Sequence, residues 1–162
     1  MKNLNDYLAI YQEQLEKGDI RKAYDGLVNF MMKLKNIFSK SLSNNFSFGG
    51  IFKGYMDYTY FYFFNDYLKS SKLKFGLVLN HKEMRFEIWL LGQTKDIQKK
   101  YWNLLRKNKW NKDKNIMPKY AILEAIIIEK PDFNNLDLLC KNIEINLVKV
   151  SNEIIIELKK IK

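Results

Sequence analysis

Residues 73–92, LKFGLVLNHKEMRFEIWLLG, constrain the fold most strongly, because apolar residues alternate on both sides of a short polar break. Alternation with a period of two is typical of β-strands that bury one face. If His81 and Lys82 form a two-residue turn, the register places four apolar pairs on one face. These pairs are Leu73 with Leu90, Phe75 with Ile88, Leu77 with Phe86, and Leu79 with Met84. We therefore predict an antiparallel hairpin with one fully apolar face.

The opposite face of this hairpin combines charged and aromatic side chains. The same register pairs Lys74 with Trp89 and Gly76 with Glu87, so that a gap lies opposite the carboxylate. Arg85 and Glu87 are two residues apart on one strand, which puts both side chains on the same side. A mostly apolar surface on which a few polar groups converge is typical of small-ligand sites. We predict that this face binds a small ligand or a protein partner.

The preceding stretch, IFKGYMDYTYFYFF (residues 51–64), extends the candidate site. We expect it to form one strand or two short strands, with Asp57 and Thr59 on the Arg85 face. Its aromatic residues point to both sides, which indicates a central strand covered on both faces; stacking of bases on exposed rings is the alternative. The predicted ligand-binding residues are therefore Asp57, Thr59, Lys74, Arg85, Glu87 and Trp89.

Three other hypotheses explain the same face without a ligand. Arg85 and Glu87 pair on an open sheet face, where such ion pairs contribute about 0–1 kcal/mol. Alternatively, a helix covers the face and the ion pair fixes the strand register. In the third hypothesis two copies of the chain meet there through Trp89 and Leu91, and the protein is a structural or homodimerising domain.

The remaining segments predict an α+β fold. Apolar residues at helical spacing predict helices over 3–17 and 20–42, joined at Gly18 as a helical hairpin, and a long final helix over 135–160. Further patterns predict a helix after Thr94. Residues 122–130 predict a strand or a short helix, and their β-branched residues favour the strand. We expect a single domain, residues 1–162, in which an antiparallel sheet with a central hairpin packs against the helical hairpin and the C-terminal helix.

Composition and charge limit the kinds of partner that the chain is expected to have. The chain has 28 basic and 18 acidic residues, a net charge of +10, and its basic residues are mostly lysine. A lysine-rich surface, densest over residues 95–114, favours nucleic acid binding as the alternative function. No apolar run reaches the roughly 20 residues needed to cross a bilayer, so we expect no membrane partner. The single cysteine, Cys140, allows no internal disulfide, and we expect a cytoplasmic protein.

The usual catalytic and metal-binding patterns are missing. With one histidine, His81, and one cysteine, a Cys/His zinc site cannot be assembled within the chain. The glycines form neither a dinucleotide-binding nor a Walker pattern, and no nucleophile-elbow motif occurs. A metal-nuclease arrangement of Asp57 with Glu87 lacks its lysine, because position 89 is Trp. We therefore predict no catalytic residue, no metal and no cofactor.

Several segments together resemble a known family. They are YQEQLEKGDIRKAYDGLVNFM, GYMDYTYFYFF, MRFEIWLLG, QKKYWNLL and WNKDK. The resemblance is to a small family of uncharacterised bacterial proteins, a domain of unknown function. It covers the first helix to about Lys114 and weakens through the C-terminal helix. It implies a bacterial, stand-alone cytoplasmic protein, and it brings no activity or site residue.

Overall fold

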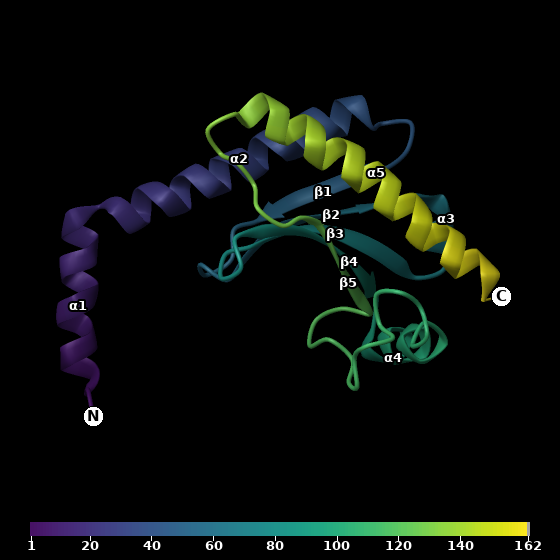
Figure 1. Ribbon diagram of the computed structural model, residues 1–162, viewed down its shortest axis with the longest axis horizontal. Helices are drawn as coiled ribbons and strands as arrows, with labels where there is room; N and C mark the ends of the chain where they lie inside the picture. Colours follow the sequence, from purple (N-terminus) through teal and green to yellow (C-terminus); the bar gives the residue numbers. More distant parts are fainter. Residues whose placement is uncertain (162) are drawn as a thin grey trace.

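The computed structural model describes residues 1–161, which form five helices and one five-stranded antiparallel sheet in the strand order β1-β2-β3-β4-β5 (Figure 1). This α+β architecture confirms the predicted fold class. The elements are α1 (Leu4–Lys17), α2 (Asp19–Ser41), β1 (Ser47–Phe52), β2 (Tyr58–Phe64), α3 (Asp66–Ser70), β3 (Leu73–Asn80), β4 (Arg85–Gly92), α4 (Lys95–Leu104), β5 (Leu123–Ile128) and α5 (Leu136–Lys160).

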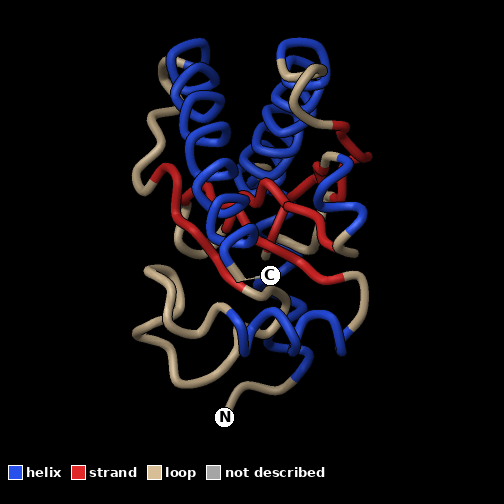
Figure 2. Tube along the Cα trace, turned by 90° about the vertical axis from the view of Figure 1, so that its right-hand side faces the viewer, coloured by secondary structure: helices blue, strands red, loops and turns tan. Residues whose placement is uncertain are grey.

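Helices α2 and α5 lie side by side on one face of the sheet, as both views show (Figures 1 and 2). The main hydrophobic core lies between these helices and the sheet. Met31 and Leu34 of α2 and Ile143 of α5 are fully buried there against the apolar hairpin face. The opposite sheet face, which we call the open face, carries no helix from this layer. Figure 1 shows α4 on that side of the sheet.

The central hairpin forms with its predicted apolar face, but its register differs from the predicted one. Leu79 pairs with Phe86 and Leu77 with Ile88, so the turn contains four residues, 81–84, instead of two. The Asn80 side chain accepts the backbone N–H of Glu83 at 3.1 Å, which stabilises this longer turn. Because the shift is two residues, an even number, every side chain keeps its predicted face.

The aromatic stretch over 51–64 divides into the end of β1 and all of β2, so the sheet contains one strand more than the minimum we expected. The division lies at residues 53–57, which we call the rim loop. Gly54 has φ +72°, and a β-carbon there would lie 2.0 Å from the carbonyl oxygen of Tyr58. Only glycine fits this turn without moving the backbone.

The N-terminal helices meet at Gly18, whose φ is +77°, and form the predicted helical hairpin. The two helices have different roles. Helix α2 packs on the sheet, whereas α1 has no buried residue, and Figure 1 shows it extending away from the rest of the chain. Helix α1 is capped at its start by Asn3 and Asp6, which exchange side-chain hydrogen bonds with each other's backbone N–H.

Candidate ligand-binding site

The open face holds a cavity of about 690 Å³ whose lining is mainly aromatic. We call it the aromatic cup. Strand β2 contributes three alternate side chains, and the remaining rings come from α2, β1, β4, the rim loop and the segment before β5. The aromatic residues of the cup are Tyr24, Phe52, Tyr55, Tyr58, Tyr60, Tyr62, Trp89 and Tyr120.

Gly76 makes the floor of the cup. In the sheet it pairs with Tyr62 on one side and with Trp89 on the other, so a residue without a side chain separates two aromatic residues. The two flanking strands are separated by about 9–10 Å, twice the usual strand spacing. A β-carbon at position 76 would make ordinary contacts, the nearest being 3.4 Å to Leu91. A larger side chain there would project into the cup.

The rings form two contact groups. Phe52 stacks on Tyr60 with ring centroids 4.9 Å apart, and both lie beside Tyr62. Trp89 forms the second group with two further tyrosines. The Tyr58 ring meets the Trp89 ring edge-on at 5.0 Å, and the Tyr120 ring lies nearly parallel to the indole, with centroids 6.4 Å apart. Rings of both groups line the cup, together with the aliphatic side chains of Val78 and Leu91.

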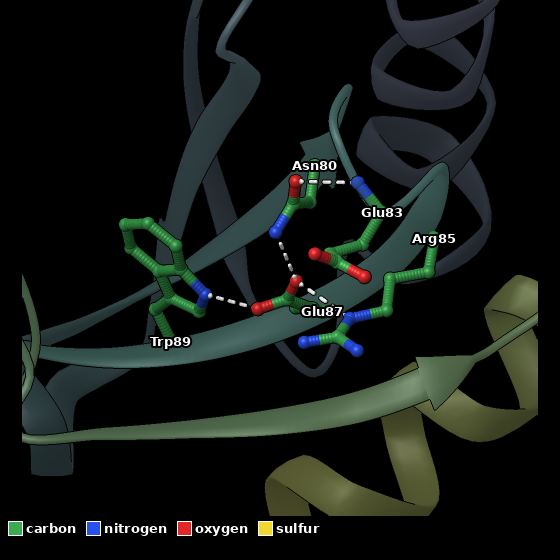
Figure 3. A network of polar contacts seen from close by, with 5 residues as sticks. All are labelled: Asn80, Glu83, Arg85, Glu87 and Trp89. Carbon is green, nitrogen blue, oxygen red and sulfur yellow. Dashed lines mark hydrogen bonds and ion pairs between the residues drawn. The ribbon is translucent and has the colours of Figure 1, made fainter.

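A buried carboxylate fixes the orientation of Trp89 (Figure 3). The side chain of Glu87 is 1% exposed and accepts three hydrogen bonds. The Trp89 indole N–H donates to Oε1 at 3.0 Å, the Asn80 amide donates to Oε2 at 2.9 Å, and Arg85 Nε donates to Oε2 at 3.1 Å. A buried acceptor with three well-placed donors restricts the rotation of all of them. Glu87 therefore supports the aromatic cup from below and does not line it.

The predicted open-face ion pair exists in a buried form. Arg85 is 24% exposed and Glu87 is 1% exposed, so this pair does not lie free in solvent. Neither residue lines the cup. The structure thus brings Arg85, Glu87 and Trp89 together as predicted, and of these three only Trp89 faces the cavity.

Thr59 lies on the other side of the sheet, contrary to our expectation. It is fully buried and pairs with Leu79, which belongs to the core face. Its hydroxyl donates to the carbonyl oxygen of Lys53 at 2.7 Å. The hydroxyl oxygen of Thr59 also lies 2.8 Å from Nε2 of His81. The error has a simple origin: Tyr58 lies on the cup side, so its neighbour must point to the core. Thr59 acts on the site indirectly, by holding the rim loop.

Asp57 lies in the rim loop and lines the cup, although its carboxylate turns to its own backbone. Oδ1 accepts the N–H groups of Tyr55 and Tyr58 at 2.9 and 2.6 Å, and these bonds lower the pKa of Asp57. The Tyr24 hydroxyl donates to the carbonyl oxygen of Gly54 at 2.9 Å and ties the loop to α2. The rim of the cup is thereby held from both sides.

Lys74 lies beside the cup without lining it. Its ammonium is 3.6 Å from the centroid of the Tyr62 ring, a cation–π contact. Burial lowers the pKa of Lys74, and burial also raises the pKa of Tyr62 to about 12. Glu124, which pairs with Trp89 on β5, has its pKa raised mainly by burial.

Sequence reasoning missed most of the residues that line the cup. The alternation of Tyr58, Tyr60 and Tyr62 did place these rings on one face, but we interpreted that face as covered core. Tyr24 and Tyr120 come from segments far away in the chain, and no local pattern connects them to β2. The mistaken hairpin register also placed Gly76 opposite Glu87, which hid its position between Tyr62 and Trp89.

The lysine-rich segment forms α4 and the loop that follows it. Several of its aromatic rings are already in contact with cations of the same segment: Arg106 lies over Trp102, and Lys109 lies over Trp110. Lys109 also pairs with Glu153 at 2.6 Å. These contacts leave the two indole rings less available for stacking with bases.

Three remaining points concern a membrane, a metal ion and a second copy of the chain. Within residues 1–161 no helix combines the length and apolar character that crossing a membrane requires. In the same described part of the chain, no three His, Cys, Asp or Glu side chains cluster as metal ligands would. Trp89 is only 6% exposed, so little of it is available for the predicted contact between two copies.

Comparison with protein families gives one match. A family model described as "Domain of unknown function (DUF7000)" matches residues 4–158. The match extends through most of α5, whereas we expected the resemblance to weaken there. Comparisons with curated proteins and with solved structures found no match.

Proposed function

We propose that this chain, which belongs to the DUF7000 family of unknown function, binds a small planar molecule in the aromatic cup. The observation that carries this proposal is the aromatic lining of the cavity, with Gly76 on its floor between Tyr62 and Trp89 of the neighbouring strands.

Size and composition support a small ligand. Pockets for small molecules usually have volumes of about 300–1,000 Å³ and mostly apolar, aromatic linings. The cup, at about 690 Å³, falls within that range.

The ring arrangement supports a flat ligand. Aromatic rings pair by offset stacking or edge-to-face contact, with centroids about 4.5–7 Å apart. A planar ring system above Gly76 reaches ring faces on both sides, where Phe52 and Tyr60 form one group and Trp89 belongs to the other. Because Glu87 already holds the indole, binding needs little ordering of Trp89.

Planar fragments screened by NMR test the proposal. The three tryptophans give three indole N–H signals, which Trp→Phe variants assign. We expect planar aromatic fragments to shift the Trp89 signal and leave Trp102 and Trp110 unchanged. Gly76→Leu, which fills the floor, should abolish the shift. Gly50→Leu is the matched control, because Gly50 is also in a strand and does not line the cup.

Two results would reject small-molecule binding at this site. The first is a screen in which no planar fragment moves the Trp89 signal. The second is a Gly76→Leu variant, folded by its NMR spectrum, that binds fragments as well as the natural chain does.

The wider context of this function rests on the sequence. We infer a single domain that works in the cytoplasm, and we expect binding more than catalysis, because the sequence contains none of the usual catalytic motifs. Nucleic acid binding through residues 95–114 and formation of a homodimer stay predictions. A nucleic acid affinity that does not fall steeply with salt would reject the former, and light scattering that detects only monomer would reject the latter.

A further inference from the structure

We infer that the ligand of the aromatic cup carries an anionic group, which the ammonium groups of Lys53, Lys74 and Lys119 bind around a planar ring. This inference rests on the proposed function, because it specifies the chemical class of the molecule that the cup takes.

Each of the three lysines is adjacent to a lining ring. Lys53 belongs to the rim loop and lines the cup itself. The Lys74 ammonium lies 3.6 Å from the centroid of Tyr62, and the Lys119 ammonium lies 5.0 Å from the centroid of Tyr120. The three lysines thus come from three separate segments, and each belongs to the lining or lies beside a ring that does.

None of these three ammonium groups forms an ion pair with a carboxylate among residues 1–161. The other basic residues near the cup are compensated. Arg85 pairs with Glu87, and Lys114 is close enough to Glu124 to oppose the rise in its pKa.

Asp57 lines the cup and forms no ion pair with a lysine or arginine among residues 1–161. Its Oδ1 already accepts two backbone N–H groups, which disperse part of its charge. Three carboxylates, those of Asp57, Glu87 and Glu124, are near enough to raise the pKa of Tyr58. The three lysines together with Arg85 and Lys114 outnumber them, which leaves an excess of positive charge around the cavity. An anion gains most from such an excess where apolar walls keep water away.

A cationic ligand is the alternative that aromatic lining usually suggests, because ring faces attract cations. Here Lys74 and Lys119 already lie over the rings of Tyr62 and Tyr120. A second cation in the cup would meet these ammonium groups at short range and would be repelled. The lysines therefore favour an anionic ligand over a cationic one.

Two fluorescent probes with the same ring system separate charge from shape. The anionic probe is 1-anilinonaphthalene-8-sulfonate, and the neutral probe is N-phenyl-1-naphthylamine, which lacks the sulfonate. Both are titrated into the full chain, into Lys53→Gln/Lys74→Gln/Lys119→Gln, and into Lys53→Gln/Lys119→Gln. The double variant changes only exposed residues. It therefore still tests the charge effect if replacing the half-buried Lys74 impairs folding.

A second triple variant controls for net charge. Lys2→Gln/Lys40→Gln/Lys141→Gln also removes three charges, at exposed positions before α1, on α2 and on α5 respectively. We expect the triple cup variant to weaken the anionic probe by at least about tenfold and the double variant to weaken it less, since each removes nearby attraction. The neutral probe should change by less than about twofold in all variants, because it has no charge to lose.

The possible outcomes separate the inference from the proposed function. If the control triple variant weakens the anionic probe as much as the cup variant does, or if both probes weaken equally, the anionic group is refuted. Binding of the neutral probe that Gly76→Leu abolishes would then still support the cup. If Gly76→Leu leaves both probes unaffected, or neither binds, the proposed function itself fails.

Discussion

Replacing Glu87 by alanine tests the support of the aromatic cup. The substitution removes the acceptor of three hydrogen bonds and leaves the donors of Trp89, Asn80 and Arg85 without it. Trp89 and Asn80 are 6% and 8% exposed, so their donors have little access to water. Each buried donor without a partner costs about 1–3 kcal/mol, whereas Arg85 at 24% exposure can turn to solvent.

These terms give an expected loss of about 3–5 kcal/mol in the free energy of unfolding, as is usual when one member of a buried pair is removed. Glu87→Gln keeps the shape but presents an N–H₂ group to at least one donor, so it should cost about 1–3 kcal/mol. With a urea dependence near 2 kcal/mol per M, the alanine variant should unfold at a midpoint about 1.5–2.5 M lower.

Urea unfolding followed by near-ultraviolet circular dichroism measures these losses. Trp89→Phe provides the control, because it keeps a ring and removes the indole N–H. In that background Glu87→Ala should cost at least about 1 kcal/mol less, as expected for contacting residues. An alanine variant that loses less than about 1 kcal/mol, or a cost that Trp89→Phe does not reduce, would refute the supporting role of Glu87.

Three further predictions concern the ends, the rim and the turn. Deleting residues 1–17 should change the unfolding free energy by no more than about 1 kcal/mol in a urea titration, since α1 buries no residue; a larger loss would show that α1 packs on the body. Gly54→Ala should lower both the melting temperature and the affinity for the neutral probe, because its methyl group meets the Tyr58 carbonyl. Unchanged values would mean that the rim loop tolerates a different backbone. Burial lowers the pKa of His81 below 6.5, opposed by Asp57, so the unfolded chain binds more protons below about pH 6.5 and stability falls as the pH drops from about 7 to 5. His81→Gln should flatten that part of the stability curve, and an unchanged slope would contradict the assignment.

The sheet was predictable from the sequence where short-range alternation decides it. The apolar sides of β3 and β4 were correctly assigned, because a strand's period of two does not depend on the turn. The turn itself was not predictable from alternation, since the two-residue and four-residue registers bury the same face. The choice depends on the Asn80 side chain, which binds Glu83 N–H and Glu87 together.

The cup was only partly predictable, because it is built from residues that are distant in sequence. Trp89 and Asp57 were expected at the site, and both line it. Thr59 was assigned to the wrong face because alternation separates it from Tyr58 but does not tell which of the two sets shares the Arg85 face. Tyr120 reaches the cup from a loop, where no periodicity indicates the direction of a side chain.

A crystal structure of the full chain with N-phenyl-1-naphthylamine is the most direct measurement of the central claim. It should place the naphthalene ring above Gly76, between the Tyr62 and Trp89 sides, with the indole still bonded to Glu87. Density for the probe elsewhere on the molecule, or an indole that has left Glu87 and filled the cavity itself, would contradict the account.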